Sequence, residues 1–203
     1  ITDGLREGLK EATYKGVLRS STVREPLKRD CLKPNNCPVF HIDFSGGSKI
    51  EVTLLVKGFG SENQTKLSML NPEYLEDEIT QIVVSHVKSA GSKACPPYII
   101  GIGIGGTADK AVALSKEATL LKLDGRNKNK KLAHLEEKIK KEVNKLGIGP
   151  LGVGGKTTCL GVKILTHPTH IAGLPLGITL SCHATRSAKR IIRVKGQGVR
   201  VKR

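Results

Sequence analysis

The sequence predicts an α/β fold, with a mixed β-sheet flanked by helices in a single domain over residues 1–203. Three observations predict it. Strand-like and helical patterns alternate along the chain, Gly-rich or Pro-containing segments separate them, and no internal repeat or clear domain boundary is visible. The core is expected to be aliphatic, because aromatic residues make up only 3% of the 203 residues.

The first part of the chain is predicted to contain a helix, a hairpin and a second helix. Apolar residues recur at helical spacing near the N-terminus, and a polar loop with Pro26 and Pro34 follows. Alternating patterns flank a Ser-Gly-Gly-Ser turn, and acidic residues open the next helix, which suits its dipole. The predicted elements are a helix over 1–15, strands over 38–44 and 49–56 joined at 45–48, and a helix over 73–90.

The second part begins after Pro96 and Pro97, where a short apolar run predicts a buried strand. A Lys/Glu-rich stretch with charges at i,i+4 spacing predicts a solvated helix. The predicted elements are strands over 98–104, 159–166 and 174–181, helices over 107–121 and 131–146, and a Gly-rich loop over 147–155. The basic stretch 186–203 is interpreted either as a junction to a further domain or as a solvated tail.

The strongly basic composition indicates an anionic partner or a solvated basic surface. The chain has 34 Lys and Arg against 18 Asp and Glu, a net charge of +16. Nucleic acid is disfavoured as that partner, because nothing is typical of a zinc finger and the few Tyr and Phe residues are scattered.

No run of about 18 apolar residues is present, and no signal peptide is recognised in these residues. We therefore expect a cytoplasmic protein without a membrane partner. Five Cys, an odd number, favour free thiols or metal ligands over disulfides. Because Ile1 already lies inside an amphipathic pattern, we also expect that part of the native N-terminus precedes it.

Two Gly-rich segments resemble nucleotide-binding loops. Gly101–Gly106 fits G-x-G-x-x-G between a predicted strand and a helix, so a nucleotide-binding module is one alternative function. The other interpretation is a turn whose small residues let two elements pack closely. The segment 149–157 resembles a P-loop, but Pro150 replaces the first Gly that the motif requires. Such a loop can still offer backbone N–H groups to a carboxylate.

The cysteines fall into three groups. Cys31 and Cys37 lie in a polar loop without a pattern of metal-ligand partners, so we interpret them as incidental. Cys159 lies in an apolar strand and is typical of a small core residue. Cys95 and Cys182 each lie where a predicted strand meets a turn, a place that can hold a ligand rigidly.

Four further segments stand out together. They are Lys57-Gly-Phe-Gly-Ser-Glu-Asn63, Cys95-Pro-Pro-Tyr-Ile-Ile-Gly-Ile-Gly-Ile-Gly-Gly-Thr107, Leu146-Gly-Ile-Gly-Pro-Leu-Gly-Val-Gly-Gly155 and His167 to Arg186. These segments resemble motifs of the class I (iron–sulfur) fumarate hydratases and L-tartrate dehydratases, in their alpha subunit or N-terminal domain. Each motif alone is weak, but they recur in the family's order from Leu18 to about Ala188, which makes the set specific.

The resemblance implies a hydro-lyase that converts fumarate reversibly to malate, with L-tartrate dehydration as the alternative. It implies a 4Fe–4S cluster held by three Cys, of which Cys95 and Cys182 are two. The third belongs to a Cys-Gln-Asp-Thr-Gly motif that is absent from these 203 residues. An iron without a protein ligand then acts as a Lewis acid on the substrate hydroxyl.

The resemblance also assigns three further residues. Arg19 corresponds to an arginine that binds a substrate carboxylate, Gly60 to a glycine whose N–H meets the substrate, and His170 to an active-site histidine. Without the resemblance, Arg19 is typical of a surface residue and His170 of a structural one. A beta subunit or C-terminal domain is expected to complete the site, so this chain alone is expected to be inactive, and an oligomer is expected.

Overall fold

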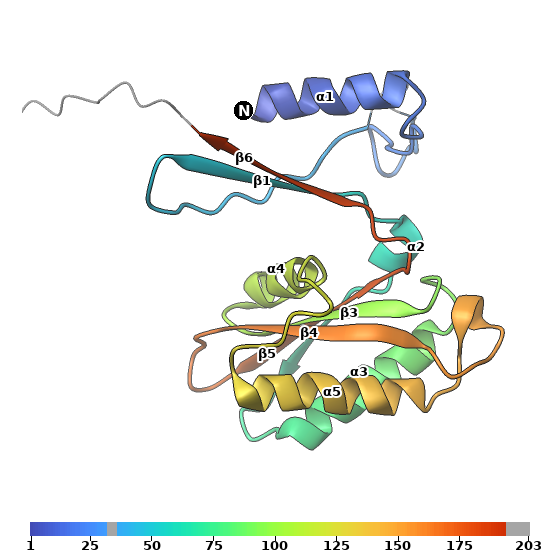
Figure 1. Ribbon diagram of the computed structural model, residues 1–203, viewed down its shortest axis with the longest axis vertical. Helices are drawn as coiled ribbons and strands as arrows, with labels where there is room; N and C mark the ends of the chain where they lie inside the picture. Colours follow the sequence, from blue (N-terminus) through green and yellow to red (C-terminus); the bar gives the residue numbers. More distant parts are fainter. Residues whose placement is uncertain (32–35, 194–203) are drawn as a thin grey trace, which may run out of the picture. The chain divides into compact units, whose positions relative to one another are not determined.

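The computed structural model describes residues 1–31 and 36–193 (Figure 1). Pro34 and the end of the basic stretch, 194–203, lie outside these described residues. The chain divides into two compact units, residues 1–48 and 49–203. The single α/β domain that the sequence predicts corresponds to the second unit, whereas the boundary after Ser48 has no visible signal in the sequence.

The first unit contains one helix, α1 (Thr2–Tyr14), which confirms the helix predicted over 1–15. Asn36 connects this helix to the loop that follows, because its side-chain nitrogen donates to Thr13 Oγ1 and to the Arg19 carbonyl, both at 3.0 Å. The strand predicted over 38–44 is wrong, since this segment takes part in no strand.

The second unit contains a two-stranded and a four-stranded sheet. The helices of the second unit are short or of medium length. In the described part of the chain, no helix is both long enough and apolar enough to cross a membrane. The elements are β1 (Lys49–Leu55), α2 (Phe59–Glu62), β2 (Lys66–Leu70), α3 (Glu76–Ala90), β3 (Tyr98–Gly105), α4 (Ala108–Ala118), α5 (Lys130–Asn144), a 3-10 turn η1 (Pro150–Gly152), β4 (Cys159–His167), β5 (Leu174–Ser181) and β6 (Ser187–Arg193).

The two-stranded sheet corrects the predicted hairpin. Strand β1 pairs antiparallel with β6, from Lys49 opposite Arg193 to Leu55 opposite Ser187. Residues 187–193 of the basic stretch therefore form the strand β6. Its partner, β1, lies more than a hundred positions earlier in the chain. Local alternation correctly located β1 but could not identify that partner.

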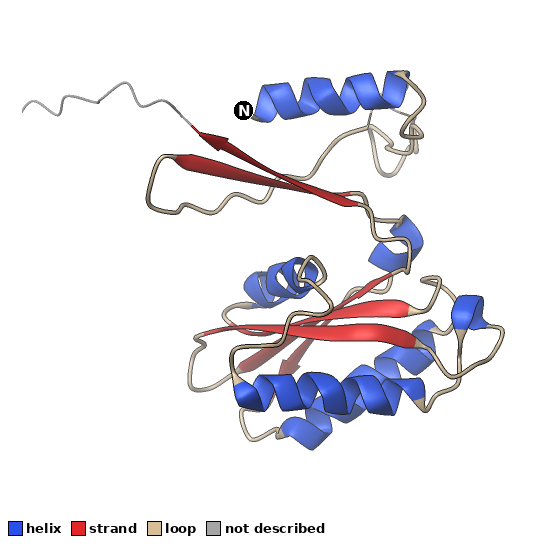
Figure 2. Ribbon diagram, viewed as in Figure 1, coloured by secondary structure: helices blue, strands red, loops and turns tan. Residues whose placement is uncertain are grey.

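The four-stranded sheet has the order β2-β5-β3-β4. Strands β3 and β4 are parallel, while β5 is antiparallel to both β3 and β2, so the sheet is mixed. Figure 2 shows helices on both sides of it: α4 covers one face, and α3 and α5 cover the other. This arrangement confirms the predicted α/β class with a mixed sheet flanked by helices.

The two faces of the sheet differ in side-chain size. The face toward α3 and α5 carries the aliphatic core, which includes Ile100, Ile102 and Ile164. On the other face, a Cβ placed at Gly101 would lie 2.0 Å from the Ser115 carbonyl oxygen, and one at Gly103 would lie 2.1 Å from that of Ala111. The missing side chains thus allow α4 to lie directly against the strand.

The space beside the glycines of the segment 101–106 is therefore filled by other parts of the chain. A Cβ at Gly105 would lie 2.0 Å from the His167 carbonyl oxygen, and one at Gly106 would lie 2.9 Å from the side chain of Lys110. Close packing explains why this segment is rich in glycine. The G-x-G-x-x-G pattern therefore no longer supports the nucleotide-binding alternative.

Candidate functional site

The pairing of β3 with β5 brings Cys95 and Cys182 to the same end of the sheet. Ile99, near the start of β3, lies opposite Ser181, the last residue of β5. Cys182 follows directly, and Cys95 lies three residues before β3 begins. His183 joins the two loops, because its Nδ1 lies 3.2 Å from the Cys95 carbonyl oxygen. We call this region the cysteine end of the sheet.

The backbone around Cys95 is tightly held, while its thiol is free and exposed. Cys95 has φ 53°, in the left-handed region, and its N–H donates to the Ser92 carbonyl at 3.0 Å. Tyr98 is fully buried, and its hydroxyl donates to the Gly91 carbonyl. Burial raises the pKa of Tyr98 to about 12, so this donor keeps its proton at neutral pH.

Cys159 behaves as the predicted core residue. It is 1% exposed, and burial raises the pKa of its thiol to about 12. A thiol of this kind is a poor source of thiolate for a metal. Cys182 differs because it is only partly buried.

The Gly-rich loop 147–155 lies against the Cys95 loop and is occupied with its own hydrogen bonds. Leu151 N–H donates to the Pro96 carbonyl at 2.8 Å, and Gly154 N–H donates to the Ile148 carbonyl at 2.9 Å. Gly155 N–H also donates back within the loop. The loop therefore supports the cysteine end, and the amides named here are committed to the chain rather than available to a carboxylate.

The short helix α2 belongs to the same end of the unit, since it lies just before β2 and contacts β5. Gly60, its second residue, is exposed. A Cβ at this position would lie 3.0 Å from the Lys93 carbonyl oxygen, which is tighter than ordinary contact. Glycine here lets the turn lie directly beside the segment that leads to Cys95.

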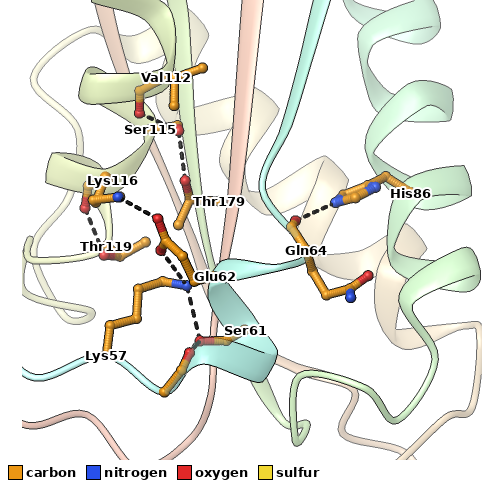
Figure 3. Close-up of polar contacts among 11 residues, drawn as sticks. Lys57, Ser61, Glu62, Gln64, His86, Val112, Ser115, Lys116, Thr119 and Thr179 are labelled. Carbon is orange, nitrogen blue, oxygen red and sulfur yellow. Dashed lines mark hydrogen bonds and ion pairs between the residues drawn. The ribbon is translucent and has the colours of Figure 1, made fainter. Parts of the chain in front are cut away.

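Lys57, Glu62 and Lys116 form a charged cluster (Figure 3), and Glu62 belongs to the same short helix as Gly60. Lys57 Nζ is 3.1 Å from Glu62 Oε2, and Lys116 Nζ is 2.6 Å from Glu62 Oε1. Lys57 Nζ also donates to Ser61 Oγ at 2.9 Å. The Lys57 side chain is only 9% exposed, so its ammonium group depends on these partners.

The pKa values in this cluster depend on burial and on the fact that two positive charges face one negative charge. Burial lowers the pKa of Lys57, and the nearby charge of Glu62 only partly offsets this. For Glu62, burial acts to raise the pKa, but the hydrogen bond from Lys116 and the charge of Lys57 outweigh it, so the pKa is lowered. Helix α2, which carries Glu62, contacts β5, and Cys182 directly follows the last residue of that strand, so the cluster lies at the cysteine end of the sheet.

His170 lies at the opposite end of the sheet. It is exposed in the loop between β4 and β5, next to the end of β3 that Gly105 marks. Thr169 Oγ1 donates to the Gly106 carbonyl at 2.9 Å and ties this loop to that end. Eight residues of β3 separate the two ends, a distance of roughly 25 Å at about 3.3 Å per residue. One copy of the chain therefore does not bring His170 to the cysteines.

Arg19 lies in the first unit, on an exposed loop. Its Nε donates to Ser21 Oγ at 3.3 Å, and its carbonyl accepts from Asn36. Cys31 and Cys37 belong to the same unit and carry free, exposed thiols. The carboxylate-binding role of Arg19 stays a prediction.

The residues that fit a metal are thus two accessible thiols at one end of the sheet. Within residues 1–31 and 36–193, no three His, Cys, Asp or Glu side chains converge as a complete metal-ligand set. Cys95 and Cys182 fit an iron–sulfur cluster as a partial set, because both are free and less than fully buried.

Sequence reasoning missed the Lys57–Glu62–Lys116 cluster. Lys57 and Glu62 lie within a segment that the resemblance singled out, but only its glycine received a role. Lys116 carries no local signal, since it is one of many Lys residues on helical patterns. The only available signal was that Lys57 and Glu62 flank Gly60 in one motif.

Comparison with known proteins gives consistent matches along the chain. The family model described as "Fumarate hydratase (Fumerase)" matches residues 1–191. A Methanocaldococcus jannaschii protein, provisionally named L(+)-tartrate dehydratase subunit alpha, is 43% identical over 197 residues, which cover 94% of this chain and 69% of that protein. The L(+)-tartrate dehydratase subunit alpha of Escherichia coli O157:H7 is 26% identical, over 93% of this chain and 63% of its own length. That of Escherichia coli strain UTI89 is 27% identical, over 90% and 61%.

Proposed function

The chain belongs to the fumarate hydratase (Fumerase) family, and from this premise we propose that it is the cluster-binding part of a dicarboxylate hydro-lyase. The leading substrate pair is fumarate and malate. L-tartrate is the second candidate, favoured by the names of the relatives from Methanocaldococcus jannaschii and Escherichia coli. The observation that carries the proposal is the β3–β5 register, which places two accessible thiols at one end of the sheet beside a cationic cluster.

Cys95 and Cys182 would hold a 4Fe–4S cluster, with a third cysteine supplied from outside these 203 residues. When bound, such a cluster supplies a Lewis-acidic iron that makes the substrate hydroxyl a better leaving group. The contact of His183 with the Cys95 carbonyl joins the two thiol-bearing loops, and the left-handed backbone at Cys95 fixes the local course of its own loop. This preorganisation lowers the ordering cost of binding.

The chain's own residues would bind and orient the anionic substrate. Arg19 offers a planar guanidinium, whose donors match a carboxylate bidentately. Gly60 exposes backbone at the cysteine end, with no side chain to keep a substrate away. Lys57 adds positive charge at the cysteine end, although most of its side chain is buried.

His170 would act as an acid or base in a site to which more than one chain contributes. Because it lies at the end of the sheet away from Cys95 and Cys182, a shared site requires His170 from a second copy of this chain. Its exposure, together with that of the neighbouring Ile171, suits a loop that reaches another molecule. A beta polypeptide would add further cations and the group that abstracts a proton.

The decisive experiment is anaerobic purification of the full complex with its beta polypeptide. We expect protein-bound iron with broad absorbance near about 400 nm, together with dehydration of malate, of L-tartrate, or of both. The ratio of kcat/KM for the two acids identifies the substrate. A folded, colourless complex that dehydrates neither acid would overturn the proposal.

Arg19→Lys tests carboxylate binding separately. The exchange keeps the charge but removes the planar fork, and a lost charge-assisted hydrogen bond is worth about 1.5–3 kcal/mol. We expect kcat/KM to fall roughly 10- to 150-fold with iron content unchanged. Unchanged kinetics would remove Arg19 from the site, as expected for an ordinary surface arginine.

A further inference from the structure

The segment from Lys57 to Gln64 is held from three directions. His86 Nε2, on α3, lies 2.7 Å from the Gln64 carbonyl oxygen. The Lys93 backbone abuts Gly60, and Lys116, on α4, reaches Glu62 at 2.6 Å. Among these three contacts, the one from Lys116 is a side-chain ion pair, and it connects the segment to α4 (Figure 3).

Helix α4 is a rigid support for that ion pair. Its Ser115 Oγ lies 2.8 Å from Thr179 Oγ1 of β5, and both residues are fully buried. The glycines of β3 let the helix backbone approach the sheet, so α4 has little freedom to shift. Lys116 follows Ser115 directly, so its side chain extends toward Glu62 from a backbone that is fixed on the sheet.

Helix α2, in contrast, cannot be stable by itself. It has four residues, and a helix this short does not offset its own nucleation cost in water. Its own polar contacts are few: the Ser61 and Glu62 N–H groups and Ser61 Oγ donate to the Gly58 carbonyl, and the Asn63 N–H donates to the Phe59 carbonyl. The orientation of Gly60 therefore depends on contacts from outside the turn.

We propose that the Lys57–Glu62–Lys116 bridge is a positioning device that fixes the Gly60 turn at the cysteine end of the sheet, ready for an anionic substrate. Glu62 accepts one lysine on each carboxylate oxygen, so its side chain is held from both sides. Lys57 in turn holds Ser61 at 2.9 Å, next to Gly60. The three side chains are positioning residues, and their effect on substrate rests on the proposed function.

The charges of the bridge support this assignment. Two ammonium groups and one carboxylate sum to a net charge of +1, in a place where the side chains are 9–29% exposed. A purely structural ion pair needs no excess cation, and burying one is costly. An excess cation at this end of the sheet suits the binding of a dicarboxylate, which carries two negative charges.

The test replaces Lys116 in the full complex. Lys116→Met removes the α4 contact but leaves Lys57 paired with Glu62, and Lys116→Arg is the conservative rescue. The matched control is Lys145→Met, which removes an ion pair of similar length, 2.7 Å to Glu142, from an exposed surface. Hydrogen–deuterium exchange of amides 58–64 and steady-state kinetics are measured on each protein, with iron content determined in the same samples.

We expect amides 58–64 to exchange about tenfold faster in Lys116→Met and KM to rise about tenfold with a smaller change in kcat. Iron content should stay unchanged, Lys116→Arg should recover most of both effects, and Lys145→Met should resemble the wild type. Unchanged exchange in Lys116→Met would overturn the proposal. So would faster exchange with an unaltered KM, since the bridge would then be structural only.

A binding readout separates this proposal from the proposed function, because it needs no turnover. Malate added to the wild-type complex is expected to slow exchange at amides 58–64, and this protection should be lost in Lys116→Met. If malate protects the wild type but is not dehydrated, and neither is L-tartrate, the proposed hydro-lyase activity fails while the bridge stands. L-tartrate is tested in parallel with malate, and equal protection of both proteins by the acid that binds, or no protection of either protein by either acid, would overturn the bridge.

Discussion

The two ends of the four-stranded sheet are constructed differently. At the cysteine end, strand pairing, a buried tyrosine and a half-buried charge cluster hold Cys95, Cys182 and Gly60 in place. At the other end, His170 lies in an exposed loop with Ile171, which is 89% exposed. The cysteine end is thus organised largely by contacts within the chain. The His170 end instead presents exposed groups whose proposed role requires another molecule.

The largest expected effect tests whether the cysteine end holds iron. Cys95→Ser and Cys182→Ser should each abolish iron incorporation and activity in the full complex, because an alcohol is a far weaker iron ligand than a thiolate. Iron per protein and dehydration rate are the measurements, with circular dichroism to confirm folding. Cys31→Ser and Cys37→Ser serve as controls and should leave both nearly intact. Iron that depends on Cys31 and Cys37 instead of Cys182 would make the ligand assignment wrong.

The second prediction tests whether the cysteine end of one copy of the chain meets the His170 end of another copy in an oligomer. His170→Asn and Cys182→Ser complexes should each be inactive, but a co-expressed mixture should regain activity. In a symmetric dimer, half of the mixed population is heterodimeric and each heterodimer has one intact site, so about a quarter of wild-type activity is expected. Absence of recovery, with mixed dimers verified by mass spectrometry, would place His170 outside a shared site.

A third prediction concerns packing at the His170 end. Gly105 has φ 92°, and an added Cβ would lie 2.0 Å from the His167 carbonyl oxygen. Gly105→Ala should therefore lower the free energy of unfolding by about 1–3 kcal/mol. Gly173→Ala, in the loop that carries His170, meets nothing within 4 Å and should stay within about 0.5 kcal/mol of the wild type. Denaturant unfolding compares them, and equal stabilities would contradict the packing argument.

The smallest expected effect is a pH dependence at the cysteine end. Burial lowers the pKa of His86, and the charge of Lys66 acts in the same direction, although the hydrogen bond to Gln64 opposes both. The folded protein thus binds this proton less readily than the unfolded chain, whose histidine pKa is about 6.5. Stability should fall as the pH drops from about 7 through 6.5 toward the lowered folded pKa. Melting temperatures of wild type and His86→Gln between neutral and mildly acidic pH measure this dependence.

His86→Gln should show a shallower loss of stability on acidification than the wild type. His41→Gln is the control, because His41 is exposed in the first unit. Identical pH profiles for wild type and His86→Gln would show that burial of this imidazole does not contribute to acid sensitivity.

Local sequence patterns were sufficient for three helices and three strands of the four-stranded sheet and its covering layers. Helices α3, α4 and α5 and strands β3, β4 and β5 all lie where periodicity predicted them, because those patterns depend on neighbours within a few residues. The strand predicted over 38–44 was wrong, and β2 and β6 were missed. Strands of this kind become stable only through partners that are distant in the sequence.

The candidate site divides in the same way. The sequence by itself determined which positions match the family's motifs, and it predicted the site roles of Cys95, Cys182, Gly60, Arg19 and His170. Only the tertiary structure decided that β5 runs antiparallel to β3, and strand direction determines which loops share an end of the sheet. It thereby joined Cys95 to Cys182, separated both from His170, and brought Lys116 to Glu62 across 54 positions of the chain. A motif specifies residue types locally, whereas proximity depends on non-local pairing.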